Sequence, residues 1–383
     1  MTNSSKSQTI NQNFPDDMRK SFDKLRNQCP VAKDASGHWQ VMDYATVERI
    51  LEDPHTFSNQ VSSHLSVPNG MDLPEHTKYR VLIEPYFSES VINRFEDDFR
   101  KTARKLISNA KKQDAAELMG TLARPYAGRV QCAFLGWPAS LADTLISWTM
   151  ENQHAARINN RDRLDELGQE FEELVAEIME QQRSSLKNNA PSTLTQSLMN
   201  EEVDGRKLTT EELTSILRNW TVGEVGSISA SIGIIIHFLA HHHEVQEQLR
   251  NHPEKITDAT DEILRIHGPL VSNRRKTTCP VQLNGEKIEK GETIYLNWIS
   301  ANRDEAVFEA PDEYREDRDS KKNLLYGKGI HVCPGAPLAR MELRIFLEEL
   351  FAQTQVICPS PGSNECYETL PASGFSYLPL TFR

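Results

Sequence analysis

The sequence predicts a mainly α-helical protein with small β-sheets, organised as a single large domain. Apolar residues recur at helical spacing over long stretches, which cover residues 95–110, 118–135, 141–149, 164–186 and 208–240. Strand-like segments are short by comparison: residues 281–283 and 293–296 lie on either side of Asn284-Gly285, a sequence typical of a hairpin turn. Hydrophobic residues make up 38% of the 383 positions, which is enough for one large core.

The N-terminal part begins with a polar segment. Residues 1–25 are rich in Ser, Asn, Gln and Lys and are predicted to form a flexible leader, so that the domain covers residues 26–383. A short strand at 39–41 and a helix at 44–51 are predicted next. Residues 58–70 contain Ser, Asn, Pro and Gly and predict a loop.

Residues 72–80 carry the signals of a helix start: an acid, a proline near the first turn and basic residues further in. His76 and Arg80 are four residues apart, so their side chains lie on one helical face. Two hydrogen-bond donors on one face can hold an anionic group.

A long helix is predicted over residues 208–240, opening with Thr209-Thr210-Glu211-Glu212, which is typical of a capping arrangement. Its middle contains Gly223 and Gly226, and each glycine costs a helix roughly 1 kcal/mol, so something needs the space there. Polar segments at 151–161, 188–195 and 201–207 lie between the predicted helices.

Composition excludes several classes of protein. The chain has 43 Lys and Arg against 55 Asp and Glu, a net charge of −12, which argues against binding to nucleic acid or to anionic membranes. Residues 1–20 lack a signal peptide's apolar segment, and the apolar stretch 232–240 is too short to span a bilayer. The six cysteines form no CxxC pair, so they are predicted to be free thiols in a reducing compartment, the cytoplasm.

The stretch from Tyr326 to Arg340 contains a lone cysteine among glycines and prolines. Cys333 is followed by Pro334 and Gly335, and then by an apolar pattern at helical spacing. The sulfur is therefore predicted to lie in a tight loop before a helix N-terminus, where backbone N–H groups favour a thiolate. A thiolate in this position suits a nucleophile or a metal ligand, and the flanking glycines favour a ligand to a large flat group.

This stretch resembles the haem-binding loop of the cytochrome P450 family, whose pattern is Phe-x-x-Gly-x-His/Arg-x-Cys-x-Gly. Every fixed position matches except the first, where Tyr326 replaces phenylalanine. The resemblance extends over roughly residues 30–383 and implies the P450 fold. It also implies that haem b is the cofactor and that Cys333 is the ligand of its iron.

The resemblance implies roles for further residues. His76 and Arg80 would bind one haem propionate and Arg275 the other. The remaining residues expected to contact the haem come from the cysteine loop and the helix after it: Tyr326, Gly327, His331, Gly335 and Ala339. Glu262 and Arg265 match the family's ExxR structural pair, with Arg318, in preference to Arg315, as the third member.

The oxygen-binding part of the long helix departs from the family pattern. The family usually places an acid and then a threonine where this chain has Gly226 and Ser227. Glu224 lies two residues before the expected acid and so on a different side of the helix, because two residues turn it by about 200°. Together with Gly223, these residues form the predicted catalytic segment. Water, Ser227 or a substrate hydroxyl would then deliver protons, and peroxide-driven turnover is an alternative.

The resemblance implies a monooxygenase that inserts one oxygen atom of O₂ into a C–H bond of a small-molecule substrate. Electrons are expected from a ferredoxin or flavodoxin with its NAD(P)H-dependent reductase, attracted by a basic patch made of Lys321, Lys322, Lys328 and Arg340. A haem-thiolate sensor without turnover is the alternative from another class.

The residues expected to line the substrate pocket are His154, Trp220, Val271 and Phe375. The regions predicted to roof the pocket, near residues 60–71 and 148–175, are rich in His, Asn, Gln and Arg. Such a roof favours a small polar methyl ether, for example a methylated sugar, which oxidation would demethylate with release of formaldehyde. Hydroxylation of a small terpenoid or aromatic compound is the alternative.

Overall fold

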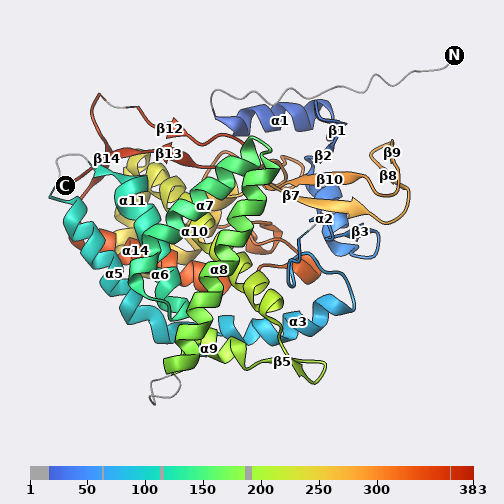
Figure 1. Cartoon of the computed structure of the whole chain (residues 1–383). Coiled ribbons are helices and arrows are strands. Elements are labelled where there is room, and N and C mark those ends of the chain that lie inside the picture. The colour runs from blue at the N-terminus through green and yellow to red at the C-terminus, as the bar shows by residue number, and fades with distance from the viewer. Residues whose placement is uncertain (1–16, 63, 113–115, 186–191, 363) are drawn as a thin grey trace.

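One long helix, α10 (Thr210–His241), runs through the middle of the molecule (Figure 1). The computed structural model describes residues 17–62, 64–112, 116–185, 192–362 and 364–383. The helix begins with a full capping box, because Thr209 accepts from the Glu212 N–H while Glu212 accepts from the Thr209 N–H. Its length and composition would allow it to cross a membrane, but more than half of that apolar window is buried by the helices around it.

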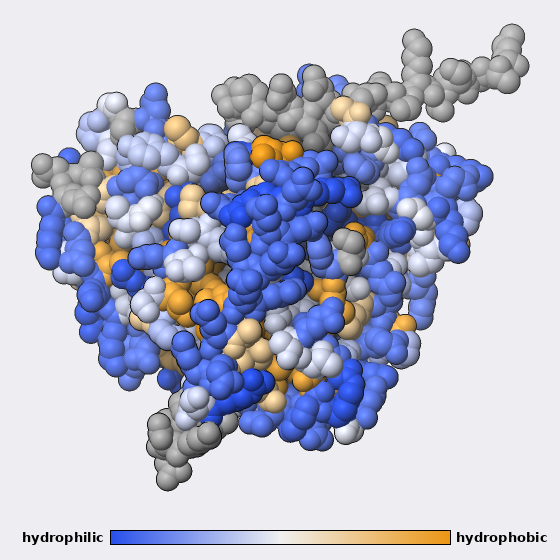
Figure 2. Space-filling view, viewed as in Figure 1, coloured by the Kyte–Doolittle hydropathy of each residue, from blue (hydrophilic) through white to orange (hydrophobic). Residues whose placement is uncertain are grey.

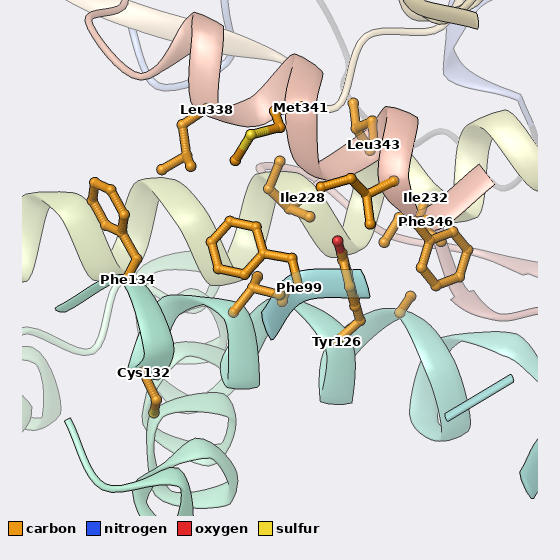
Figure 3. Close-up of a cluster of buried hydrophobic side chains, with 14 of the residues drawn as sticks. Phe99, Tyr126, Cys132, Phe134, Ile228, Ile232, Leu338, Met341, Leu343 and Phe346 are labelled. Atoms are coloured by element: carbon orange, nitrogen blue, oxygen red, sulfur yellow. The ribbon is translucent and has the colours of Figure 1, made fainter. Parts of the chain in front are cut away.

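The helices packed on α10 form the main body and the larger core. They are α6 (Arg124–Leu135), α7 (Ala142–Arg157), α8 (Arg161–Ser185), α12 (Ile256–Ile266) and α14 (Ala336–Gln353). Figure 3 shows where α10, α6 and α14 meet: Ile228 and Ile232 of α10 lie among Phe134, Leu338 and Phe346. The helix α5 (Glu96–Ala110) closes this core by packing along α14.

A five-stranded sheet stands at the side of the helical body, to the right in Figure 1. Its order is β1 (Val31–Lys33), β2 (Trp39–Val41), β10 (Thr293–Asn297), β7 (Ser272–Thr277) and β3 (Phe57–Ser58). The helix α2 (Tyr44–Glu52) and this sheet enclose a second core, which contains Val47, Ile294 and Leu296. The strand β7 matters for the site because it carries Arg275.

The remaining elements are short. They are α3 (Glu75–Ile83), α4 (Glu89–Ile92), α9 (Leu194–Met199), α11 (His243–Asn251), α13 (Trp298–Ala301), β5 (Glu202–Val203) and β6 (Arg206–Lys207). The polar segment after residue 149 proves to be helical, because α7 continues to Arg157. Of the loop predicted at 188–195, residues 188–191 lie outside the described part of the chain, and its last two residues begin α9.

One hairpin prediction needs correction. The turn at Asn284-Gly285 joins β8 (Val281–Leu283) to β9 (Glu286–Ile288), whereas residues 293–297 pair with β7 and β2. Near the C-terminus, β12 (Cys366–Tyr367) forms a hairpin with β13 (Phe375–Tyr377). The last strand, β14 (Pro379–Phe382), pairs instead with β11 (Ile357–Pro359) and β4 (Ala116–Glu117). Alternation of side chains identifies strands but does not choose their partners.

The predicted leader boundary at residue 25 is wrong for its last part. The helix α1 (Met18–Gln28) buries Met18 and Phe22 against Ile299. Arg26 of the same helix donates to the Ser300 carbonyl at 2.8 Å. The helix is amphipathic, so its polar composition hid a buried apolar stripe. Residues 1–16 of the predicted leader lie outside the described residues. The cytoplasmic location of the protein stays a prediction.

Candidate functional site

A cavity of about 1490 Å³ lies between the middle of α10 and the loop around Cys333. Its volume exceeds the roughly 300–1,000 Å³ typical of small-molecule pockets, so it has room for more than one small ligand. Strand β7, the loop before α3, the end of α7 and the tip of the β12–β13 hairpin complete its wall. Most of the residues predicted from the sequence lie on it: Gly223, Glu224, Gly226, Ser227, Arg275, Tyr326, Gly327, His331, Cys333, Gly335 and Ala339.

Cys333 lies on the cavity wall, just before α14. Its own N–H donates to the Tyr326 carbonyl at 2.8 Å, which closes the loop. Burial raises the pKa of the Cys333 thiol, although the N–H groups of Gly335 and Ala336 oppose this. The helix N-terminus was predicted to favour the thiolate, but in the protein without a bound metal ion the effect of burial on the pKa is larger. A metal ion deprotonates a coordinating thiol outright, so this sulfur would become a thiolate on binding an iron ion.

The cysteine loop is held from both sides. Gly329 has a left-handed backbone with φ of +73°, and a Cβ there would lie 2.3 Å from the Leu51 carbonyl oxygen of α2. Only glycine allows this approach, so Gly329 serves the packing of the loop on α2. On the other side, Arg340 pairs with Asp261 at 2.8 Å and lies over the Tyr326 ring at 4.6 Å.

Two buried basic side chains, His76 and Arg275, and the partly buried His331 have no acidic hydrogen-bond partner in the described part of the chain. The rings of His76 and His331 meet edge to face at 4.3 Å, and both ring nitrogens of His76 and Nε2 of His331 lack hydrogen bonds. Arg275 donates to the Arg274 carbonyl at 2.8 Å. Burial lowers the pKa of Arg275 to about 10, and burial with nearby cations lowers that of His331 to about 3. Buried donors without partners are rare, so this cluster fits an anionic ligand such as the propionates of a haem.

His76 and Arg80 do not line the cavity themselves; they lie behind its wall, and His76 packs on His331. Arg80 already has partners within the chain, because it pairs with Glu84 at 2.7 Å and donates to the Val332 carbonyl at 2.6 Å. Arg80 thus links α3 to the cysteine loop, which leaves Arg275 with the freer guanidinium.

Behind the loop, Glu262 brings two arginines together. It pairs with Arg265 at 2.7 Å and with Arg318 at 2.8 Å, and the Glu262 and Arg265 side chains are both under a tenth exposed. Arg265 also donates to the carbonyls of Asn302 and Pro311. Arg315, the other candidate for the third member, pairs through its side chain with exposed acids instead. This network ties α12 to the segment that leads into the cysteine loop.

The comparison with protein families agrees with this site. The model of the family described as cytochrome P450 matches residues 154–380, more than half of the chain, and the chain belongs to this family. Cytochrome P450 109 of Bacillus spizizenii is 29% identical over 380 residues, covering 94% of this chain and 91% of that protein. Linalool 8-monooxygenase of Pseudomonas putida is 28% identical and covers 86% and 87%.

Solved structures agree on the fold. A mutant of P450 EryK in complex with erythromycin B superposes with a TM-score of 0.85 at 25% identity, covering 95% of this chain and 96% of that one. CYP109Q5 from Chondromyces apiculatus gives a TM-score of 0.84 at 26% identity, with 95% of each chain covered. The predicted P450 fold is confirmed, and the protein is a P450 monooxygenase whose cofactor is haem b.

The segment of α10 that was predicted to be catalytic, Gly223 to Ser227, lines the cavity. The Ser227 hydroxyl donates back to the Gly223 carbonyl one turn earlier. Gly226 stands where an acid was expected, and a Cβ there would lie 2.8 Å from Nε2 of Gln153. The amide of Gln153, from α7, therefore occupies the space beside Gly226. Sequence patterns gave no reason to pair Gln153 with Gly226, because α7 and α10 meet only in the folded chain.

The substrate-pocket predictions divide into two groups. His154, Trp220 and Phe375 line the cavity. Val271 does not: it is buried against α1 with Met18, Phe22 and Ile299, and its neighbours Leu270 and Ser272 face the cavity instead. The prediction for Val271 is wrong because the side chains next to it in sequence point to the opposite side of the backbone.

Polar side chains of the roof face inwards as well as outwards. Figure 2 shows a hydrophilic outer surface over α8. The inner wall nevertheless includes His64, Asn152, Gln153, His154 and Arg157. Arg157 is held between His154, at 2.6 Å, and Thr369 of the hairpin tip, at 2.8 Å.

The predicted basic patch is smaller than expected. Lys328 pairs with Glu48 at 2.6 Å and with Glu52 at 2.8 Å, and Arg340 pairs with Asp261. Lys321 and Lys322 remain exposed in the 3-10 turn Ser320–Lys322. The positive charge on this face therefore rests mainly on these two lysines.

Proposed function

We propose that the substrate of this monooxygenase is a small, hydroxylated methyl ether, such as a methylated sugar, which is O-demethylated with release of formaldehyde. The observation that carries this proposal is the polar inner roof of the cavity, formed by His64, Asn152, Gln153, His154 and Arg157. The amides of Asn152 and Gln153 are half-buried, so an apolar substrate packed against them would exclude water without offering partners, which costs about 1–3 kcal/mol for each group. A substrate with several hydroxyl groups would satisfy them.

The chemistry follows from the cofactor and from these residues. Haem iron held by a cysteine thiolate activates O₂ for insertion of one oxygen atom into a C–H bond. Oxidation of an O-methyl group gives a hemiacetal, whose C–O bond then breaks: the departing alcohol oxygen takes up the proton that the hemiacetal hydroxyl loses, and formaldehyde leaves. Overall, R–O–CH₃, O₂, two electrons and two protons give R–OH, HCHO and H₂O. Gln153 and Arg157 would orient the substrate, and Ser227 would move a proton at its hydroxyl oxygen.

We also propose an acidic ferredoxin or flavodoxin, with its NAD(P)H-dependent reductase, as the electron donor. The exposed pair Lys321 and Lys322 precedes the cysteine loop and stands out on a chain with a net charge of −12. Opposite charges raise association rates, and salt screens this effect. Electron transfer should therefore slow with rising salt, and Lys321→Glu with Lys322→Glu should remove most of that salt dependence.

Hydroxylation of a small terpenoid or aromatic compound is the second candidate. One end of the cavity is aromatic: Phe87, Phe134 and Trp220 line it, with ring centroids of Phe87 and Trp220 5.1 Å apart. One relative is named linalool 8-monooxygenase. An apolar substrate could pack on this wall, although it would leave the opposite roof unsatisfied.

A ferric spin-state titration separates the two candidates. The purified holoenzyme is titrated with methylated sugars, the matching unmethylated sugars, and terpenoid and aromatic compounds. A low-to-high-spin shift with the methylated sugar, followed by one formaldehyde per product alcohol during turnover, would support demethylation. A shift only with terpenoids or aromatics would overturn it and support the second candidate. Turnover with hydrogen peroxide alone, run in parallel, tests the peroxide-driven alternative.

A further inference from the structure

Two glutamates from different helices meet in the core beside the cavity. Glu224 belongs to α10 and Glu342 to α14, and their carboxyl groups lie close enough to interact. Glu342 is 0% exposed. Both of its oxygens, and Oε1 of Glu224, are buried without a hydrogen-bond donor among the described residues. Figure 3 shows that Met341 and Leu343, which precede and follow Glu342 in the chain, belong to the apolar core.

This pair differs from the other buried glutamates of the chain. Glu262 has two arginine partners, Glu212 pairs with Arg206 at 2.7 Å, and Glu349, two turns further along α14 than Glu342, pairs with Arg100 at 3.2 Å and Arg104 at 2.9 Å. Two carboxylates without a cation cannot both stay ionised in the core, so they share protons. Burial raises the pKa of Glu224 to about 6 and that of Glu342 well above its usual range, where the neighbouring Glu224 charge adds to the effect.

Glu224 is the member of the pair that connects it to the cavity. Glu224 lines the cavity, whereas Glu342 does not. Glu224 also stands three residues before Ser227 on α10, a spacing that makes their side chains neighbours on the helix surface. Gly226, at the position of the expected acid, offers no side chain for this purpose.

We propose that Glu224 and Glu342 act as a proton-holding pair, in which Glu224 takes up a proton and passes it to Ser227 or to a water beside it. The pair would thereby replace the acid missing at Gly226. This role concerns the monooxygenase reaction and does not depend on which substrate is used.

The proton moves in two steps. Glu342 stays protonated, and its hydroxyl donates to the ionised Glu224 carboxylate, which stabilises that charge inside the core. Glu224 accepts a proton at its carboxylate from water in the cavity and releases it to the Ser227 oxygen or to a bridging water, returning to the ionised form. A pKa near the working pH makes uptake and release both easy. The other titratable groups that face the pair are Tyr126 of α6 and Cys333.

Infrared difference spectra of the ferric holoenzyme test the pair without turnover. A protonated carboxyl group gives a C=O band that a carboxylate lacks. The wild type should show such bands at pH 5 and lose part of the signal on titration through pH 6. Glu224→Gln should remove the titrating part and Glu342→Gln the part that persists at pH 7. The matched control, Glu349→Gln on the same helix, should leave both. Absence of any such band at pH 7 in the wild type would overturn the proposal.

Turnover then tests the role in proton delivery. Glu224→Gln keeps the shape of the side chain but cannot release a proton. Product formed per NAD(P)H oxidised should fall by about an order of magnitude or more, with the missing electrons recovered as hydrogen peroxide. Turnover driven by hydrogen peroxide, which brings its own protons, should change less than about twofold. Equal loss in both assays, or loss in neither, would overturn the proposal. Glu224→Asp, which keeps the acid, should restore part of the coupling, and an unchanged thiolate–CO band verifies the haem site.

Discussion

Charged groups are arranged in opposite ways in two regions of the molecule, the network behind the cysteine loop and the α10 side of the cavity. Behind the loop, acids and bases are matched: Glu262 holds Arg265 and Arg318, and Asp261 holds Arg340. On the α10 side an acid faces another acid, since Glu224 meets Glu342. Matched charges hold a loop in one position, whereas unmatched groups are available to ligands and protons. The difference separates the part expected to position the haem from the part proposed to act on substrate and protons.

The largest effect is expected at Cys333. Cys333→Ala removes the proposed iron ligand, so the absorbance band that a thiolate ligand gives to the reduced CO complex should disappear completely. The measurement is the CO-difference spectrum of the purified variant, with Cys366→Ala, at an exposed position, as the control. A thiolate–CO band that survives in Cys333→Ala would contradict the assignment of this sulfur.

The next effect should come from the matched charges behind the loop. Glu262→Gln leaves Arg265 and Arg318 without their carboxylate, and breaking a buried ion pair in this way costs about 3–5 kcal/mol. Urea unfolding of the holoenzyme measures this loss. Arg315→Ala, which breaks exposed pairs with Glu309 and Glu313, should cost less than about 1 kcal/mol. Equal losses of unfolding free energy in the two variants would contradict a stabilising role of the Glu262 ion pairs.

The buried acid Glu224 should make the free energy of unfolding depend on pH. Burial raises the pKa of Glu224 from 4.5 to about 6, so the folded chain binds this proton more tightly than the unfolded chain. The associated stability is fully present below pH 4.5 and is lost as the pH rises through 6. Glu224→Gln should remove this loss, about 2 kcal/mol between pH 4 and pH 8. Unfolding curves at both pH values check it, and parallel curves for wild type and variant would contradict it.

The smallest effect is expected at the roof. Gln153→Leu keeps most of the side-chain volume beside Gly226 but removes the amide. Affinity for a hydroxylated substrate should fall about tenfold, roughly 1.4 kcal/mol, because one hydrogen bond is lost. The spin-state titration measures this, and the thiolate–CO band should not change. Stronger binding of the methylated sugar by Gln153→Leu would contradict a polar binding roof.

The cysteine loop was the most predictable part of the site, because its residues are neighbours in the chain. The long helix and its capping residues Thr209 and Glu212 were equally accessible, since period and caps are local signals. The pairing of the strands was less predictable. The alternation at 293–297 identified a strand, but its pairing with β7 and β2 depended on residues far away in the sequence. Val271 shows the same limit, because its burial against α1 could not be seen from its own segment.

The sequence by itself determined the class of protein and the absence of an acid at Gly226, and it predicted Cys333 as the iron ligand. Only the tertiary structure decided what stands in that place. Gln153 reaches Gly226 from α7, and Glu342 reaches Glu224 from α14. Periodicity and motifs record interactions between residues close in sequence. The state of a buried carboxyl group depends instead on whichever groups the packing of distant helices brings against it, and that is settled only when the chain has folded.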